Sequence, residues 1–177
     1  WTHFTFTHTR EHRHVAAFFQ NYAGKVMSDD FGGYDCLALE QRAACLAHAR
    51  RKFFEARDAH PVEAVEMLER IRLLYALEAQ LHAAVEHDAE RLAMRQREAV
   101  PRLESIKERL ELWAKTALPK SPLGKAVSYA LNNWPRLLRY TEDPRLPIDN
   151  NAAEQAIRPI AIGRRNWLFM GSERGGH

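Results

Sequence analysis

The feature that most constrains the fold is a long run of helical periodicity in the middle of the chain. Apolar residues recur every three or four positions from Val62 to Val85, and the spacing returns in the later part of the segment from Asp88 to Leu118. Side chains with this period lie along one face of an α-helix. Pro101 is expected to break or kink the second segment. We therefore predict a long helical hairpin that packs on itself and buries this stripe: Val65, Leu68, Ile71, Leu74, Leu77, Leu81, Val85, Leu103, Ile106, Leu110 and Trp113.

The residues before the hairpin show a different pattern. Aromatic and polar residues alternate from Trp1 to Thr9, as in a strand with one buried face. Gly24 is suited to end a helix that precedes it. The predicted elements are strands over 1–9, 25–28 and 42–47 and helices over 11–22 and 49–59. Strand, helix and strand in succession are typical of a mixed α/β sheet, in which functional side chains gather at strand ends.

Short helices are predicted after the hairpin. Ser121 is a good N-cap, and Pro122 suits the first position of a helix that reaches Asn132. A further short helix is predicted over 134–140. The segment 141–147 contains two prolines and is predicted as the loop that leads into the last helix.

Charge is distributed unevenly along the chain. The formal net charge is +3, but the segment from Val62 to Leu112 holds 11 acidic and 8 basic residues and so carries −3, which leaves +6 on the rest. A basic body with an acidic helical segment suits a polyanionic partner for the body. Two cysteines do not make a disulfide framework, and no signal peptide or membrane-spanning run is present. We expect a cytoplasmic protein with no membrane partner.

Asp29 follows the strand predicted over 25–28, which is the position of a metal ligand in a mixed sheet. It also begins the run Asp-Asp-Phe-Gly-Gly, and Asp and Gly are the residues that dominate turns. The two interpretations are compatible, because a ligand can lie on the turn itself.

A second carboxylate, Glu154, lies a few residues inside a predicted helix start, for which 149–151 offers three good N-caps. The dipole at a helix N-terminus favours the ionised form, so Glu154 is suited to hold a cation. A structural interpretation stays open. Asn151 with Glu154 resembles a capping box, and Glu154 with Arg158 has the i,i+4 spacing of an ion pair.

Basic residues lie close to both carboxylates in the sequence. Arg50, Arg51 and Lys52 form one cluster, and Gly163–Phe169 adds arginines and a tryptophan, as a phosphate-binding surface would. A solvated helix face is the alternative for the first cluster. Cys45 and His48 have a spacing seen in zinc sites, but no second pair completes four ligands, which argues against zinc.

The segment Pro147–Pro159, followed by Gly163–Phe169, resembles the C-terminal catalytic motif of the IS66-type insertion-sequence transposases, a family similar to other DDE recombinases built on an RNase H-like fold. Three further blocks agree with this family in the right order: Ser28–Tyr34, Cys45–Phe54 and Leu118–Ala126. The resemblance therefore covers essentially the whole chain.

The resemblance implies an incomplete RNase H-like mixed sheet with a long, mostly helical insertion. The chain would divide into a first part of the catalytic core (1–54), the helical insertion (55–146) and a C-terminal motif segment (147–177). Asp29 matches the second catalytic acid and Glu154 the third, and both would bind the two Mg²⁺ or Mn²⁺ ions of such a site. The family's first aspartate lies on an earlier strand. We therefore expect a chain truncated at both ends and inactive as it stands.

The partner implied by the resemblance is DNA, both as element ends and as target, with self-association on DNA and a place in the bacterial nucleoid. The expected DNA-binding residues are His48, Arg50, Arg51, Lys52, Arg158, Arg164, Arg165, Asn166 and Trp167. A nuclease or resolvase would use the same acids without joining ends. A non-catalytic DNA-binding module would need only the arginines, and a helical interaction protein would depend on the hairpin.

Overall fold

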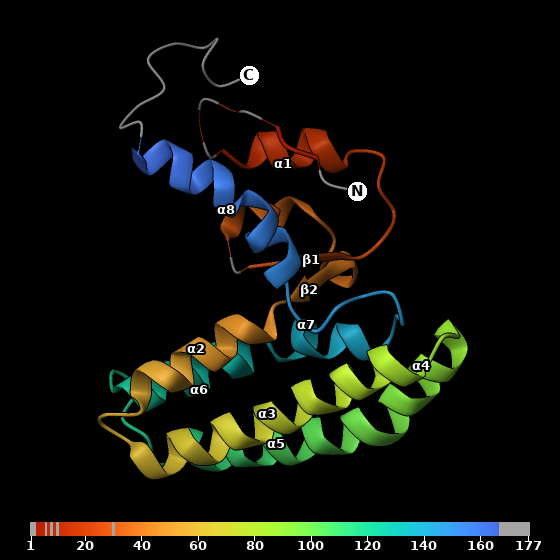
Figure 1. The fold of residues 1–177 in the computed structure, drawn as a ribbon. Helices are drawn as coiled ribbons and strands as arrows, with labels where there is room; N and C mark the ends of the chain where they lie inside the picture. The colour runs from red at the N-terminus through yellow and green to blue at the C-terminus, as the bar shows by residue number, and fades with distance from the viewer. Residues whose placement is uncertain (1–2, 6, 8, 10, 30, 167–177) are drawn as a thin grey trace.

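α-Helices make up most of the protein in the computed structural model, which describes residues 3–5, 7, 9, 11–29 and 31–166 (Figure 1). Among these residues no helix has both the length and the apolar composition that a membrane span requires. The elements in chain order are α1 (His12–Phe19), β1 (Val26–Ser28), the 3₁₀ turns η1 (Gly32–Cys36) and η2 (Leu39–Gln41), β2 (Arg42–Ala44), α2 (Leu46–Ala56), α3 (Pro61–Ala84), α4 (Asp88–Met94), the π-helical turn η3 (Arg95–Ala99), α5 (Val100–Ala114), α6 (Pro122–Asn132), α7 (Trp134–Leu138), the 3₁₀ turn η4 (Arg139–Thr141) and α8 (Asn151–Asn166).

Within the described residues, β1 and β2 form a parallel two-stranded sheet, with Val26 opposite Arg42 and Ser28 opposite Ala44. This confirms the strand predicted over 25–28 and the first half of the one predicted over 42–47. The strand predicted over 1–9 is wrong for its described residues, since 3–5, 7 and 9 are not in a strand. Alternation alone does not hold a strand, because its backbone groups must also pair with a neighbouring strand. The predicted α/β class therefore holds only as a mixed, mostly helical fold.

Helix α1 is shorter than the helix predicted over 11–22. It ends at Phe19, and the N–H of Tyr22 then donates to the carbonyl of Phe19 (2.9 Å), which closes a turn. Gly24 does not cap the helix. It lies against the ring of Tyr22 instead, where a Cβ atom would be 2.4 Å from the Tyr22 hydroxyl oxygen.

The predicted helical hairpin is confirmed, and α3 lies beside α5 along its length (Figure 1). Polar contacts cross between the two arms. Glu66 on α3 accepts a hydrogen bond from Arg109 on α5 (2.7 Å), and Arg70 on α3 donates to Ser105 on α5 (2.7 Å). The predicted interface residues are buried except Val65, which is 55% exposed, and Leu68, which is half-buried.

Pro101 does not interrupt the second arm, contrary to the expected break. Residues 88–114 stay helical, and the π-helical turn Arg95–Ala99 lies just before the proline. Proline lacks an N–H and its ring crowds the carbonyl four residues earlier, and a π turn is a wider turn of the kind found at such positions. The segment therefore stays helical around Pro101 because the turn before it is π-helical.

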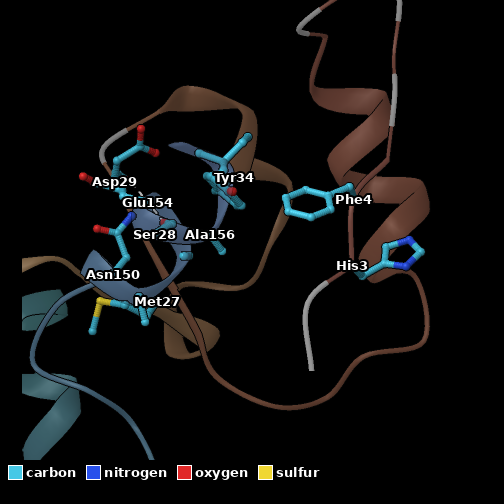
Figure 2. Close-up of a pocket in the computed structure, with 12 residues that line it drawn as sticks. His3, Phe4, Met27, Ser28, Asp29, Tyr34, Asn150, Glu154 and Ala156 are labelled. Atoms are coloured by element: carbon cyan, nitrogen blue, oxygen red, sulfur yellow. Dashed lines mark hydrogen bonds between the residues drawn. The ribbon is translucent and has the colours of Figure 1, made fainter. Parts of the chain in front are cut away.

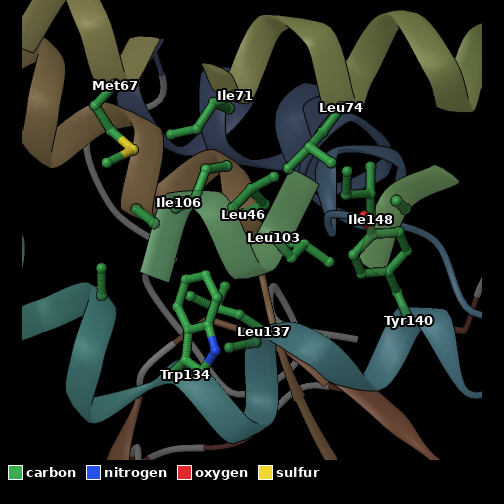
Figure 3. Close-up of a cluster of buried hydrophobic side chains, with 14 of the residues drawn as sticks. Leu46, Met67, Ile71, Leu74, Leu103, Ile106, Trp134, Leu137, Tyr140 and Ile148 are labelled. Carbon is green, nitrogen blue, oxygen red and sulfur yellow. The ribbon is translucent and has the colours of Figure 1, made fainter. Parts of the chain in front are cut away.

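The hairpin also packs on α2 and α6, so its apolar face is shared with a larger core (Figure 3). Leu46 from α2, Leu103 from α5 and Ile148 from the loop before α8 belong to the same buried cluster. Ser121 caps α6 as predicted, because its hydroxyl accepts from the N–H of Gly124 at 3.0 Å. The core thus joins segments on both sides of the hairpin.

Candidate functional site

The site is built around the junction of β1, α2 and the start of α8. The backbone N–H of Cys45 donates to the carbonyl of Ser28 (3.2 Å), and the N–H of Leu46 donates to the carbonyl of Ile148 (3.2 Å). The N–H of Asn150 in turn donates to the sulfur of Cys45 (3.4 Å). These three bonds hold the end of β1, which carries Asp29, close to the first turn of α8.

Asp29 and Glu154 line one cavity of about 580 Å³ (Figure 2). They come from segments 125 positions apart in sequence. No lysine or arginine is present among the described residues that line this cavity, which are His3, Phe4, Met27, Ser28, Asp29, Tyr34, Asn150, Ala152, Ala153, Glu154, Ala156 and Ile157. The structure therefore brings the two predicted acids into the lining of one cavity.

Asp29 is placed by the turn that follows β1. One carboxylate oxygen, Oδ1, accepts a hydrogen bond from the N–H of Phe31 (3.3 Å), which is the turn role that its sequence also indicated. Burial, and then the negative charge of Asp29, raise the pKa of Tyr34 in the same cavity wall. Tyr34 therefore stays a neutral phenol at physiological pH and can donate a hydrogen bond toward an anion.

Glu154 lies in the first turn of α8, at the positive end of the helix dipole. Its Oε1 atom is 3.7 Å from Nε2 of His48, which comes from α2. The other ring nitrogen of His48, Nδ1, is buried and has no hydrogen-bond partner in the described part of the chain. The side chain of Glu154 is 45% exposed, so it is open to a ligand.

The capping box suggested by Asn151 and Glu154 does not form at the start of α8. Asn151 is the first helical residue, and both its N–H (3.0 Å) and its side-chain amide (2.7 Å) donate to the carboxylate of Asp149. That carboxylate also accepts from the hydroxyl of Tyr75 on α3 (2.8 Å). Burial, and then this hydrogen bond, raise the pKa of Tyr75. Asp149 therefore links the start of α8 to α3, and its carboxylate accepts three hydrogen bonds.

Asn150 is the residue of this site that sequence reasoning missed, since it was weighed only as a cap. It lines the acid cavity, and its Oδ1 atom is buried without a hydrogen-bond partner among the described residues. Buried amide oxygens nearly always have a partner, which a bound ion or an ordered water would supply here. The only signal in the sequence was its position between Asp149 and Glu154.

A second cavity of about 390 Å³ shares Asp29 with the first. The predicted DNA-binding residues His48, Arg51 and Lys52 line it, together with Glu55, Phe31 and Tyr129. Arg50 is exposed on α2 and is not in that lining, and Arg158 is exposed on α8. Residues 164–166 form the last turn of α8, but the side chains of Arg164, Arg165 and Asn166, and all of Trp167, lie outside the described part.

The donor set fits a hard divalent cation, because Mg²⁺ and Mn²⁺ prefer carboxylate, amide and water oxygens. Asp29 and Glu154 supply two carboxylates and Asn150 an amide oxygen. Within the described residues no cluster of three or more His, Cys, Asp or Glu side chains is arranged to hold a metal ion. The described residues thus supply oxygen donors at one cavity, but fewer than three His, Cys, Asp or Glu side chains arranged to hold a metal ion.

The comparisons with known proteins concern the whole chain. The family model for the transposase IS66 family matches residues 1–177. Three proteins of Sinorhizobium fredii (strain NBRC 101917 / NGR234), each described as uncharacterized, are similar to it. Protein y4hP is 32% identical, and the match covers 94% of this chain and 33% of y4hP. Protein y4jD is 27% identical, with 98% of this chain and 35% of y4jD covered. Protein y4qI is 33% identical, with 93% of this chain and 31% of y4qI covered.

The chain spans about a third of the length of these curated relatives. No solved structure matches the chain significantly. The family match covers every block on which the resemblance was based, including the segments that carry Asp29 and Glu154. The chain belongs to the transposase IS66 family.

Proposed function

We propose that this chain is part of the catalytic region of a DNA transposase that cuts and joins DNA strands in a metal-dependent reaction. The observation that carries the proposal is the shared cavity of Asp29 and Glu154, two acids 125 positions apart in sequence. Each has an adequate local role as a turn residue or a first-turn acid, so local structure gives no reason for them to meet.

The finer fold assignment is also part of the proposal. Asp29 follows a strand of a parallel pair, and a long helical segment separates it from Glu154, as an RNase H-like core with a helical insertion requires. The division into a core part (1–54), an insertion (55–146) and a motif segment (147–177) follows from that assignment.

Each residue of the site has a role in this mechanism. Asp29 and Glu154 would hold the divalent cations, and the buried Oδ1 of Asn150 would be a further oxygen ligand. The bound ions would activate a water or a DNA 3′-hydroxyl and stabilise the leaving oxygen of an in-line displacement. Tyr34, kept neutral, donates toward a DNA phosphate at the cavity wall.

The basic residues serve DNA binding in this proposal. His48, Arg51 and Lys52 contact phosphates next to the acids. The remaining predicted contacts, Arg50, Arg158, Arg164, Arg165, Asn166 and Trp167, would extend along α2, α8 and the segment after it. The partners are element ends and target DNA, with self-association on DNA and a location in the nucleoid.

The test measures Mn²⁺ binding to the 177-residue chain. Electron paramagnetic resonance gives the concentration of free Mn²⁺, and the melting temperature of the protein is recorded with and without the ion. Asp29→Asn and Glu154→Gln should each weaken Mn²⁺ binding at least tenfold and remove the metal-dependent rise in melting temperature, because bound ligand stabilises the folded state. Glu55→Gln is the matched control, since Glu55 lines the neighbouring cavity and not the acid cavity. This variant should bind Mn²⁺ as tightly as the unaltered chain does. Equal binding by all four proteins would refute the proposal.

A non-catalytic DNA-binding role is the second candidate. It is favoured by the finding that the described residues form no cluster of three metal-binding side chains, so a third carboxylate has to come from outside them. DNA binding that is unaffected by Asp29→Asn and by Mn²⁺ would support this role. For a longer protein that supplies the third acid, strand-transfer products would distinguish a transposase from a nuclease on the same site, which would give hydrolysis alone.

A further inference from the structure

The second cavity has the composition of a nucleotide site. It lies between the turn after β1, helix α2 and helix α6, and it combines cations with two aromatic rings, Phe31 and Tyr129. Its volume of about 390 Å³ falls in the range of pockets that hold small organic ligands. Basic groups bind phosphate and aromatic rings stack on bases, so together they are typical of sites for a single nucleic-acid strand.

The ring of Phe31 is held in place by its own turn. It meets Tyr34 edge-on, with ring centroids 6.2 Å apart and planes at 90°. Gly33 lies directly under it, and a Cβ atom there would be 2.2 Å from Cε1 of Phe31. Tyr34 lines the acid cavity and Phe31 lines the second one, so this aromatic pair contributes one ring to each cavity.

The charges of the second cavity are arranged for a phosphate near Asp29. Arg51 is exposed and Lys52 half-buried on successive positions of α2, and His48 lies one turn earlier. The ammonium of Lys52 is 3.9 Å from the carboxylate of Glu55, a loose contact between two partly exposed groups. Among the described residues that line this cavity, Glu55 and Asp29 are the groups that would repel a phosphate.

We infer that the second cavity seats the nucleotide adjacent to the scissile phosphate, with Arg51 and Lys52 on its phosphate and Tyr129 or Phe31 against its base. The inference rests on the proposed function, because the acid cavity on the other side of Asp29 would hold the reacting phosphate. Asp29 is the wall that the two cavities share, so consecutive phosphates of one strand would lie on either side of it.

The test measures binding of the 177-residue chain to a fluorescently labelled DNA duplex with a short single-stranded 3′ end, by anisotropy at several salt concentrations. The double variant Arg51→Gln, Lys52→Gln should bind about tenfold more weakly at low salt, and its salt dependence should fall by the equivalent of about two phosphate contacts. Glu55→Gln should bind more tightly, because it removes a negative charge from the same wall.

The aromatic contact is tested with Tyr129→Leu and Phe31→Leu on normal DNA and on DNA that has abasic sites in the 3′ end. At least one of them should lose several-fold in affinity for normal DNA and much less for abasic DNA, since the stacked base is then absent. Equal losses on both DNAs, or unchanged binding by the Arg51, Lys52 double variant, would overturn the inference.

Mn²⁺ binding separates this inference from the proposed function. All of these variants should bind Mn²⁺ as the unaltered chain does, whereas Asp29→Asn should not. Loss of Mn²⁺ binding in Tyr129→Leu would count against a nucleotide seat, because it would mean that this wall supports the acids instead. If the proposed function is wrong, Asp29→Asn and Glu154→Gln will bind Mn²⁺ as tightly as the unaltered chain does.

Discussion

The sulfur of Cys45 accepts a hydrogen bond from the backbone N–H of Asn150, with 3.4 Å between the two atoms. The residues are 105 positions apart, and each starts a helix on a different side of the candidate site. Cys45 is buried, 1% exposed, and its own N–H donates to the carbonyl of Ser28 at the end of β1. A buried thiol that accepts a backbone hydrogen bond has a structural role, and we expect it to react slowly with alkylating reagents.

The first prediction concerns thiol reactivity. Burial raises the pKa of Cys45, and the charge of Asp149 adds to the effect. A raised pKa means less thiolate at a given pH, and only the thiolate attacks alkylating reagents. Iodoacetamide at pH 8 should therefore modify the exposed Cys36 in the native protein and leave Cys45 unmodified. Mass spectrometry should find one adduct in the native protein and two after unfolding in urea, and two adducts in the native protein would contradict the assignment.

The second prediction concerns Arg95, which is 3% exposed in the π-helical turn. Its guanidinium donates to both carboxylate oxygens of Glu78 (3.0 and 2.6 Å) and to the carbonyls of Tyr140, Asp143 and Leu146 (2.8, 2.9 and 3.0 Å). Removing one partner of a buried pair leaves the other charge unpaired.

Arg95→Met should therefore lower the free energy of unfolding by about 3–5 kcal/mol, measured by urea denaturation. Arg97→Ala is the matched control from the same turn, because its side chain is 69% exposed and contacts Glu98 at the surface. That control should change stability by less than about 0.5 kcal/mol. Similar losses in both variants would show that the turn itself, and not the buried guanidinium, sets the stability.

The third prediction concerns Gly124 in the first turn of α6. Glycine in a helix usually gains about 0.5–1 kcal/mol when replaced by alanine. Here a Cβ atom would lie 2.1 Å from the backbone carbonyl oxygen of Leu118, so the chain before the helix would have to move. Gly124→Ala should instead destabilise the protein, by about 1–3 kcal/mol. Gly32→Ala, whose Cβ would have an ordinary contact of 3.5 Å to Asp35, should melt close to the parent temperature.

The fourth prediction concerns pH. The hydrogen bond from Arg109, and then the one from Arg70, lower the pKa of Glu66 below its ordinary value of 4.5. A carboxyl group whose folded-state pKa is lowered stabilises the protein above its unfolded-state pKa, and this contribution is lost as pH falls through the folded-state value. Glu66→Gln should therefore cost more stability at pH 7 than at pH 3. Urea titrations of both proteins at the two pH values measure this, and a difference that stays constant with pH would contradict the ion-pair explanation.

Much of the helical body could be predicted from the sequence, because its stripe of apolar residues has one period over many turns. Ile71, Leu74 and Leu103 lie in the core as predicted. Val65 is exposed despite its spacing, because the buried face at this end of α3 passes through Ala64 and Met67 instead. The π-helical turn before Pro101 could not be foreseen, because it depends on how the backbone relaxes around the proline.

The candidate site was predictable only in part. Local position indicates Asp29 and Glu154 as separate cation ligands, and the resemblance pairs them in one site. Their shared cavity arises from backbone bonds through Cys45 and Leu46 that no local pattern encodes. Asp149 and Asn150 looked equivalent as caps, yet the carboxylate of Asp149 accepts three hydrogen bonds, whereas the buried Oδ1 atom of Asn150 has no hydrogen-bond partner among the described residues. Such differences depend on tertiary neighbours such as Tyr75.

Helix α8 extends away from the helical body, and nearly all of its described side chains are exposed (Figure 1). At about 1.5 Å of rise per residue, Glu154 lies only about 6 Å along the axis from the attachment at Asn150, whereas the backbone of residue 165 lies about 22 Å away. The acid therefore lies close to the attached end of the helix, and residue 165 lies far from it. A tilt of about 10° would shift Glu154 by about 1 Å but residue 165 by about 4 Å. In the proposed DNA complex, the far end of the helix could thus follow the curvature of a duplex while the carboxylate of Glu154 moves little.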